Sequence, residues 1–417
     1  MSRLQEAREA FSRLCVSSRD DAIGVHTATL QPLAGYSNND RHTAQSWTIH
    51  GQRWIFLAIC DGHTGSHVTA EYTVNTLPDK IKAALERFIE KDMQRATDRE
   101  TLLSNAEALS STLGQVVERF DEKLGSEVKQ ICPKPKKLSE EESKALMRVH
   151  FDVIERAFCG CTLVAALVNV ESRCLWTLNV GDSTVGLSCE TENGRRDWLR
   201  LSESHKLTNP QEYFRVVMEH PSDERVQLTD DDRILGWLDM TRSIGDYSMK
   251  LKKAYITHLF DYNPDTRERN PKAPKAELVK TPPYLTAKPS VRFVDLGPLW
   301  AAKPTVILFS DGVDDIVREY ACYVPKVERK VDAGSVVAKI LGNDADRVEA
   351  GELLGHQVEP LWSEEGKLAV EVLENLFGGT DAERIEQVNQ QAVWTDWDNP
   401  PDLYVDDTTL ILCTLSH

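Results

Sequence analysis

Aspartates stand at the ends of several short apolar runs in this sequence. Asp61, Asp182 and Asp311 each directly follow or lie one residue beyond such a run, and Asp406 lies just before another. Runs of this length, rich in β-branched and aromatic residues, indicate buried strands. Because strand ends are rigid, short carboxylates placed there can converge with a defined geometry. Each aspartate alone is more simply explained as a turn former or helix cap, but the repeated pattern favours a shared site.

Converging carboxylates repel one another, and a hard divalent cation relieves that repulsion. No pair of His or Cys residues accompanies these aspartates, so the ligands would be oxygens and the expected ion is Mg²⁺ or Mn²⁺. A carboxylate that bridges two such ions ~3.5–4 Å apart would activate water and hold a phosphoryl group. His63 follows Asp61 by two residues and, with an ordinary pKa of about 6.5, could exchange protons near neutral pH. A hydrogen-bonded structural histidine is the alternative.

The elements that must position these residues are short strands alternating with amphipathic helices. The predicted strands are residues 53–60, 161–170, 174–180, 305–309 and 408–415. Helices are predicted over residues 1–15, 66–92, 99–130, 139–158 and 364–378, the fourth of them opened by a capping box of Ser139 and Glu142. Because strands occur near both ends of the chain, we expect one domain that N- and C-terminal strands close together.

The composition is that of a soluble globular protein. The 417 residues include 49 Lys and Arg against 66 Asp and Glu, a net charge of −17, with 41% hydrophobic residues. Such a surface repels phosphate backbones and anionic lipids, so we expect neither nucleic-acid binding nor attachment to acidic membranes. Ordinary Gly and Pro contents and the lack of a persistent heptad exclude collagen, low-complexity and coiled-coil classes. No stretch reaches the ~18 apolar residues that span a bilayer.

Cysteine usage and the first residues suggest where the protein works. Nine cysteines, an odd number placed mostly in apolar runs, indicate reduced thiols in an intracellular compartment. Glu6 and Glu9 argue against a mitochondrial presequence, because such segments are poor in acidic residues. We therefore expect a cytoplasmic protein, with the mitochondrial matrix as the alternative.

Seven short motifs, taken together and in order, resemble those of the protein phosphatase 2C family of metal-dependent serine/threonine phosphatases. They are Tyr36-Ser37-Asn38-Asn39-Asp40-Arg41, Asp61-Gly62-His63-Thr64-Gly65, Gly160-Cys161-Thr162 with Asn179-Val180-Gly181-Asp182-Ser183, His205-Lys206 with Asn209-Pro210-Gln211-Glu212 and Arg215, Thr241-Arg242-Ser243-Ile244-Gly245-Asp246, Ser310-Asp311-Gly312-Val313-Asp314-Asp315, and Asp406-Asp407-Thr408-Thr409. The resemblance covers roughly residues 20–415. Residues 281–287 (TPPYLTA) are also similar to the pyruvate dehydrogenase phosphatase branch.

This resemblance implies an α+β fold, a four-layer α-β-β-α sandwich in which two antiparallel sheets are flanked by helices. It also implies a metal centre of two Mg²⁺ or Mn²⁺ ions, with a third in some members. Asp61 would bridge the two ions, and the carbonyl of Gly62 would bind one of them. Asp311 and Asp406 would complete the coordination of the first ion.

The remaining roles follow from the same resemblance. Asp40 would orient the water that the metals activate, and His63 would protonate the leaving serine or threonine oxygen. Asp182 and Asp315 match positions that hold the third, looser ion. The implied reaction hydrolyses phosphoserine and phosphothreonine in protein substrates without a covalent intermediate.

The implied domain organisation is simple. Residues 1–19 form an N-terminal extension, and residues 20–417 form a single catalytic domain. That domain would carry a helical insertion at about 92–158, a flap beside the active site at about 205–240, and a polar insertion at about 250–290.

Two departures from the family pattern bear on activity. Animal members carry Glu-Asp where this chain has Asn39-Asp40, and an arginine that holds the phosphate where this chain has Gly35. Asn39 therefore predicts a greater need for Mg²⁺, unless its side chain simply faces solvent. Arg41 and Arg53 are the candidates for binding the phosphate.

Three functions are consistent with these patterns. An active protein phosphatase is favoured, because the acidic residues and His63 are retained. A catalytically weak relative that serves as a binding or regulatory module is the alternative that Asn39 and Gly35 support. Another two-metal hydrolase, such as a nuclease, is opposed by the acidic surface.

Overall fold

The computed structural model describes residues 2–64, 66–230, 232–263, 276–318, 330–361, 367–393 and 405–415, with the backbone alone at Val226. Parts of three predictions lie outside these ranges. They are Gly65 of the 61–65 motif, residues 264–275 of the polar insertion, and the first residues of the helix predicted over 364–378.

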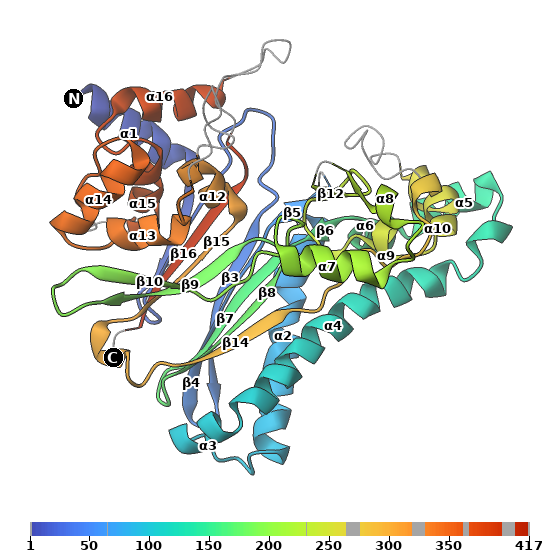
Figure 1. Ribbon diagram of the computed structural model, residues 1–417, viewed down its shortest axis with the longest axis horizontal. Coiled ribbons are helices and arrows are strands. Elements are labelled where there is room, and N and C mark those ends of the chain that lie inside the picture. Colours follow the sequence, from blue (N-terminus) through green and yellow to red (C-terminus); the bar gives the residue numbers. More distant parts are fainter. Residues whose placement is uncertain are drawn as a thin grey trace.

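Two antiparallel sheets lie face to face at the centre of the molecule (Figure 1). The first has six strands in the order β1 (Val16–Asp20), β2 (Val25–Leu30), β16 (Thr408–Thr414), β15 (Thr305–Phe309), β9 (Thr184–Glu190) and β10 (Arg196–Arg200). The second has five, in the order β14 (Ser290–Asp295), β8 (Cys174–Val180), β7 (Leu163–Asn169), β4 (Gln52–Cys60) and β3 (Arg41–Ile49). The C-terminal β16 lies between β2 and β15, so distant parts of the chain close one sheet, as predicted.

Strand β4 shows why these strands appear as continuous apolar runs in the sequence. Successive side chains of a strand point to opposite faces, and both faces of β4 are covered. Ile55, Leu57 and Ile59 lie in the core between the two sheets. Trp54 and Phe56 lie in the core between the second sheet and the helices. Burial on both sides therefore accounts for the unbroken apolar run at 54–60, whereas Gln52 and Arg53 at the start of the strand are only half-buried.

Helices cover the outer face of each sheet (Figure 1). The helices over the first sheet are α1 (Arg3–Leu14), α12 (Asp311–Arg318), α13 (Ala333–Ile340), α14 (Asp344–Leu354), α15 (Leu368–Phe377) and α16 (Ala382–Gln391). The helices over the second sheet are α2 (Val68–Lys91), α3 (Arg99–Ser104), α4 (Ala106–Ile131) and α6 (Phe151–Phe158). This arrangement confirms the predicted four-layer sandwich.

Shorter elements gather beside one end of the second sheet (Figure 1). A three-stranded sheet has the order β13 (Ile244–Gly245), β6 (Gly160–Cys161), β5 (Gly62–His63), and a two-stranded one pairs β11 (Thr229–Asp230) with β12 (Arg233–Ile234). The accompanying helical turns and helices are η1 (Pro135–Lys137), α5 (Glu140–Val149), α7 (Pro210–Glu219), α8 (Arg225–Leu228), α9 (Tyr247–Lys250), α10 (Lys253–His258), η2 (Phe260–Tyr262) and η3 (Ala276–Leu278). Turn η4 (Trp300–Ala302) precedes β15.

Two of the predicted helices are each divided by one residue. Asn105 separates α3 from α4, and its side chain donates to the Thr101 carbonyl at 2.8 Å, ending the first helix. His150 separates α5 from α6 with a backbone conformation outside the helical region. The capping box of Ser139 and Glu142 is confirmed, because each side chain accepts a hydrogen bond from the other's backbone.

The N-terminal residues are part of the sandwich. Ala7 and Phe11 of α1 are buried in the core over the first sheet, and β1 pairs along its whole length with β2. Residues 3–20, most of which were predicted to be an N-terminal extension, therefore pack as part of the same sandwich as the residues predicted to form the catalytic domain. No helix within the described ranges is both long and apolar enough to cross a membrane. The cysteines described in those ranges form no disulfide bonds.

Candidate active site at the strand ends

The aspartates predicted from strand ends do converge, and Asp61 lies among the others. It follows β4, whereas Asp311 follows β15 and Asp406 precedes β16, so both sheets contribute. Burial raises the pKa of Asp61 well above its ordinary value, and the charges of Asp40, Asp311, Asp406 and Asp182 raise it further. Mutual electrostatic repulsion of this kind requires the carboxylates to be close neighbours.

Asp40 is buried next to the same cluster, with only 3% of its surface exposed. Its Oδ2 accepts a hydrogen bond from the Ser310 hydroxyl at 2.7 Å, whereas its Oδ1 has no hydrogen-bond partner among the described residues. Burial raises the pKa of Asp40 to about 7, and the charges of Asp407 and Asp311 add to this increase. The hydrogen bond from Ser310 acts in the opposite direction. A buried carboxylate oxygen without a partner is costly unless it binds something further.

Asp406 and Asp315 complete the group around Asp311. Burial raises the pKa of Asp406 to about 7 and that of Asp315 to about 8, and in both cases Asp311 is the neighbouring charge that adds most. The six aspartates predicted as metal ligands are therefore brought into one another's electrostatic field.

Gly62 is a glycine because the chain passes very close to another backbone segment here. A Cβ at this position would lie 2.7 Å from the carbonyl oxygen of Asn39. The neighbouring Asp61 is held by Thr162, whose hydroxyl accepts from the Asp61 N–H at 3.1 Å and whose N–H donates to the Asp61 carbonyl at 2.9 Å. The first two motifs are thus packed directly against each other.

A lysine supplies positive charge within the acidic group. The Nζ of Lys206 lies 2.8 Å from Asp182 Oδ2, 3.3 Å from Asp239 Oδ2 and 3.7 Å from Asp311 Oδ2. Burial lowers the pKa of Lys206, but the three carboxylates outweigh it and hold that pKa well above its ordinary value. Neither Lys206 nor Asp239 was expected in the site, although Lys206 belongs to the motif at 205–206.

The donor set fits a hard divalent cation, although the side chains are not arranged around one. Within the described ranges, no three His, Cys, Asp or Glu side chains are positioned as they stand to hold a metal ion. The chemistry nevertheless suits Mg²⁺ or Mn²⁺, because the donors are all oxygens and several carboxylates repel one another. Oδ1 of Asp40 and Oδ1 of Asp182 are buried without a hydrogen-bond partner in the described part of the chain.

His63 lies beside the carboxylates and is held by a residue 183 positions away. Its Nε2 is 2.6 Å from Oδ2 of Asp246, whose side chain is 1% exposed. Burial lowers the pKa of His63, but the charge and hydrogen bond of Asp246 outweigh it and raise that pKa to about 9. The contact with Asp246 therefore favours the protonated form of the imidazole. Its Nδ1 has no hydrogen-bond partner among the described residues.

The segment that carries Asp246 is anchored to α4 through Asp121. The carboxylate of Asp121 accepts from the Gly245 N–H at 2.8 Å and from Lys250 Nζ at 2.9 and 3.0 Å. The Tyr247 hydroxyl donates to the Asp121 carbonyl at 2.6 Å. Gly125, one turn further along α4, has no room for a Cβ, which would lie 2.0 Å from the Tyr247 ring.

Comparison with known proteins identifies the family. The family described as Protein phosphatase 2C matches residues 35–348, which include six of the seven motifs. This chain belongs to the protein phosphatase 2C family. The family is metal-dependent, in agreement with the carboxylate cluster.

Relatives and solved structures agree with this assignment. Pyruvate dehydrogenase (acetyl-transferring) phosphatase 1, mitochondrial, of Pongo abelii is 31% identical over 41% of this chain and 32% of its own length. The human phosphatase 2 of the same name is 26% identical over 62% of this chain and 48% of its length. The chain thus matches between a third and a half of these relatives. A crystal structure of serine-threonine phosphatase 2C from Toxoplasma gondii shares the fold, with a TM-score of 0.50, 15% identity, and coverage of 96% of this chain and 98% of that one.

Asn39, the first departure from the phosphatase 2C pattern, does not face solvent. It is half-buried, its backbone N–H donates to Asp407 Oδ2 at 2.9 Å, and its side-chain amide interacts with the same carboxylate. Gln31 donates to the other oxygen of Asp407 at 2.7 Å. The side chain of Asn39 is therefore partly exposed but has a partner, in contrast to the alternative of an amide that simply faces solvent. The side chain at position 39 is thus an amide, and the side chain that it contacts, Asp407, is a carboxylate.

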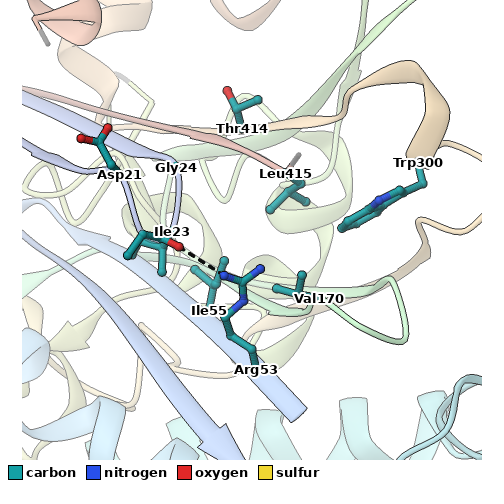
Figure 2. Close-up of a pocket in the computed structure, with 10 residues that line it drawn as sticks. Asp21, Ile23, Gly24, Arg53, Ile55, Val170, Trp300, Thr414 and Leu415 are labelled. Carbon is teal, nitrogen blue, oxygen red and sulfur yellow. Dashed lines mark hydrogen bonds between the residues drawn. The ribbon is translucent and has the colours of Figure 1, made fainter. Parts of the chain in front are cut away.

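The two arginines proposed to bind phosphate lie in different places. The Arg41 Nη1 donates to the carbonyls of Asn38 and Asp40 at 2.8 Å each, so Arg41 is next to the acidic cluster. Arg53 lies at the far end of β4, eight residues and therefore about 26 Å from Asp61. Figure 2 shows its guanidinium directed into a different pocket, near Trp300, and it donates to the Ala22 carbonyl at 3.2 Å. The structure does not bring Arg53 to the site.

Gly35 is exposed, with a φ of +80° and no heavy atom within 4 Å of the position where a Cβ would lie. A larger side chain would therefore have space at this position, but a positive φ strains any residue other than glycine.

Proposed function

We propose that this chain hydrolyses phosphoserine and phosphothreonine in proteins, with two Mg²⁺ or Mn²⁺ ions and no covalent intermediate. The observation that carries the proposal is the convergence of aspartates from both sheets on Asp61, next to a histidine that Asp246 holds through its Nε2. Family membership supports the same reaction.

The residues that would hold the metal ions are Asp61 and the carbonyl of Gly62, with Asp311 and Asp406. When bound, such ions neutralise phosphate charge and lower the pKa of water so that it can attack phosphorus. Asp40 lies beside Asp61, and its Oδ1 has no other partner, so it is suited to accept a hydrogen bond from the attacking water.

His63 is suited to act as the general acid. Asp246 holds Nε2, which leaves Nδ1–H of the imidazolium as the group that gives its proton to the departing serine or threonine oxygen. When that proton is transferred, the P–O bond to the alcohol breaks and the imidazole becomes neutral. Divalent cations bound nearby would lower the pKa of His63 from about 9, which eases this transfer.

Asp182 and Asp315 are proposed to hold a third, weaker ion. Lys206 already pairs with Asp182, so a third cation would have to displace its ammonium group or share the carboxylate with it. Weak binding at this position is the expected result.

The substrate class is phosphoproteins, and the high negative charge of the chain opposes nucleic-acid substrates. We propose a cytoplasmic location. The mitochondrial matrix remains the alternative, which the names of the two pyruvate dehydrogenase phosphatases favour.

Turnover of a phosphothreonine peptide tests the function. We expect phosphate release with Mn²⁺ or Mg²⁺, none in excess chelator, and recovery when the metal is restored. An Arg53→Gln variant is a matched control, because Arg53 lies far from the carboxylates and should leave turnover unchanged. Full activity in chelator would refute the metal-dependent mechanism. Peptide binding without turnover under all metal conditions would instead support the alternative of a binding or regulatory module.

A further inference from the structure

A groove of about 710 Å³ lies on the helical side of the molecule, away from the aspartates. Its walls carry five exposed lysines, namely Lys129, Lys134, Lys136, Lys137 and Lys252. Its floor is apolar and includes the buried side chains of Pro135, Leu251 and Tyr255. The groove therefore combines an apolar base with a strongly basic rim.

Local sequence explains how these lysines come together. Helix α4 ends at Ile131, and the prolines at 133 and 135 prevent the helix from continuing. The chain turns through η1, which packs against α10, so that residues 134–137 lie opposite residues 252–255. Segments separated by more than 100 residues thus form the two sides of the groove.

The rim of the groove is positively charged. None of the five exposed lysines forms an ion pair in the described part of the chain, in contrast to Lys250, which is 6% exposed and binds Asp121. Two acids that follow the groove segment in sequence are occupied, because Glu140 pairs with Lys144 and Glu142 caps α5. Five unpaired ammonium groups around one groove, in a chain of net charge −17, attract a negatively charged partner.

We propose that this groove docks an acidic segment of the protein substrate, rich in Asp and Glu. The apolar floor favours a polypeptide, whose aliphatic side chains and backbone can cover Leu251 and Tyr255 while its carboxylates meet the lysines. The groove also adjoins the active-site wall, because α9 begins directly after Asp246 and ends at Lys250, which lines the groove. The docking role rests on the proposed phosphatase function, whereas acidic-peptide binding itself does not.

A matched pair of variants tests the proposal without altering the active site. The groove variant combines Lys134→Gln, Lys136→Gln and Lys137→Gln, all at exposed positions. The control combines Lys80→Gln, Lys82→Gln and Lys91→Gln on α2, which remove the same charge elsewhere. Binding of a fluorescent 12-residue Asp/Glu peptide is measured by anisotropy. Turnover is measured with p-nitrophenyl phosphate and with a phosphothreonine peptide that carries the same acidic segment.

We expect the groove variant to bind the acidic peptide at least tenfold more weakly than the control variant, and its binding to depend less on salt. Its KM for the acidic phosphopeptide should rise by a similar factor, while turnover of p-nitrophenyl phosphate is unchanged. Equal losses in the two variants would overturn the proposal. Tighter binding of an RNA oligonucleotide or of phosphatidylserine vesicles than of the acidic peptide would also overturn it.

The two proposals fail in different ways. If the protein hydrolyses p-nitrophenyl phosphate but the groove variant binds and processes the acidic phosphopeptide normally, docking is refuted and the phosphatase function stands. If no substrate is hydrolysed but acidic-peptide binding is lost only in the groove variant, the phosphatase function fails and the groove remains an acidic-peptide site without the docking role.

Discussion

The contact between Asn39 and Asp407 predicts that these two residues can be exchanged together but not changed singly. Asn39→Glu alone would set a second carboxylate against Asp407, in a half-buried place where the present amide is attractive. Asp407→Asn alone would remove the acid that accepts from the Asn39 and Gln31 donors. The double change reverses the order of acid and amide and preserves both the net charge and the pairing.

The magnitude follows from the contacts. Two carboxylates ~4 Å apart repel by about 4 kcal/mol at an effective dielectric constant of 20, and protonation of one of them limits the cost. Loss of a hydrogen bond to a charged acceptor costs about 1.5–3 kcal/mol. Asn39→Glu alone should therefore destabilise by about 2–4 kcal/mol and raise the Mn²⁺ concentration needed for half-maximal activity. We expect a coupling free energy of about 2 kcal/mol between the two positions.

Urea unfolding and Mn²⁺ activation curves of the four proteins in this double-mutant cycle measure the coupling. Ser37→Glu is the matched control, because it adds the same charge at an exposed position two residues away. Additive effects within about 0.5 kcal/mol would refute the pairing. A lower Mn²⁺ requirement in Asn39→Glu alone would show instead that the added acid supports the metal centre directly.

Three further predictions concern the active site. Asp246→Asn removes the charge that raises the pKa of His63, so the alkaline limit of phosphopeptide turnover should move to lower pH, with a loss above that limit of about tenfold for each unit by which the pKa falls. An unchanged pH profile would exclude this role. His63→Gln should reduce turnover of alkyl phosphoesters by ~10²–10⁴-fold but scarcely affect turnover of p-nitrophenyl phosphate, whose leaving group needs no proton. Equal losses of turnover with the two substrates would show that His63 is not the general acid. Asp61→Ala should abolish turnover, whereas Asp182→Ala should only reduce it. The reason is that Asp61 lies against four other carboxylates, whereas Asp182 lies beside a lysine. Small, equal losses of turnover in steady-state assays would contradict the assignment.

Five strands were predictable because burial on both faces makes their sequences almost uniformly apolar, whereas strands with exposed residues, such as β1 and β3, were missed. The run predicted over 305–309 is β15, and the run over 174–180 is β8. The helix interruptions at Asn105 and His150 were missed because apolar residues keep the same helical spacing on both sides of each break. Periodicity reports which side of a segment is buried, and it is insensitive to a single residue that changes the direction of the chain.

In the site, the motifs located the aspartates, whereas the contacts between motifs required the structure. Asp246 holds His63 across 183 residues, and Lys206 reaches carboxylates from three separate segments. Such pairings depend on how the sheets stack, and no local spacing encodes them. Arg53 shows the converse, because a residue close to Asp61 in sequence lies far from it once the strand between them is extended.

The attachment of Asp121 to residues 245–250 restricts how this protein can be re-engineered. Replacing residues 92–158 with a tight turn, to obtain a smaller protein, would remove the only acid that Lys250 pairs with in the described ranges. A buried charge that loses its partner costs about 3–5 kcal/mol. The turn that presents Asp246 to His63 would lose its anchor at the same time. Helix α4 and the Gly245-Asp246 turn therefore form one transferable unit, and a graft onto another scaffold would need to carry both.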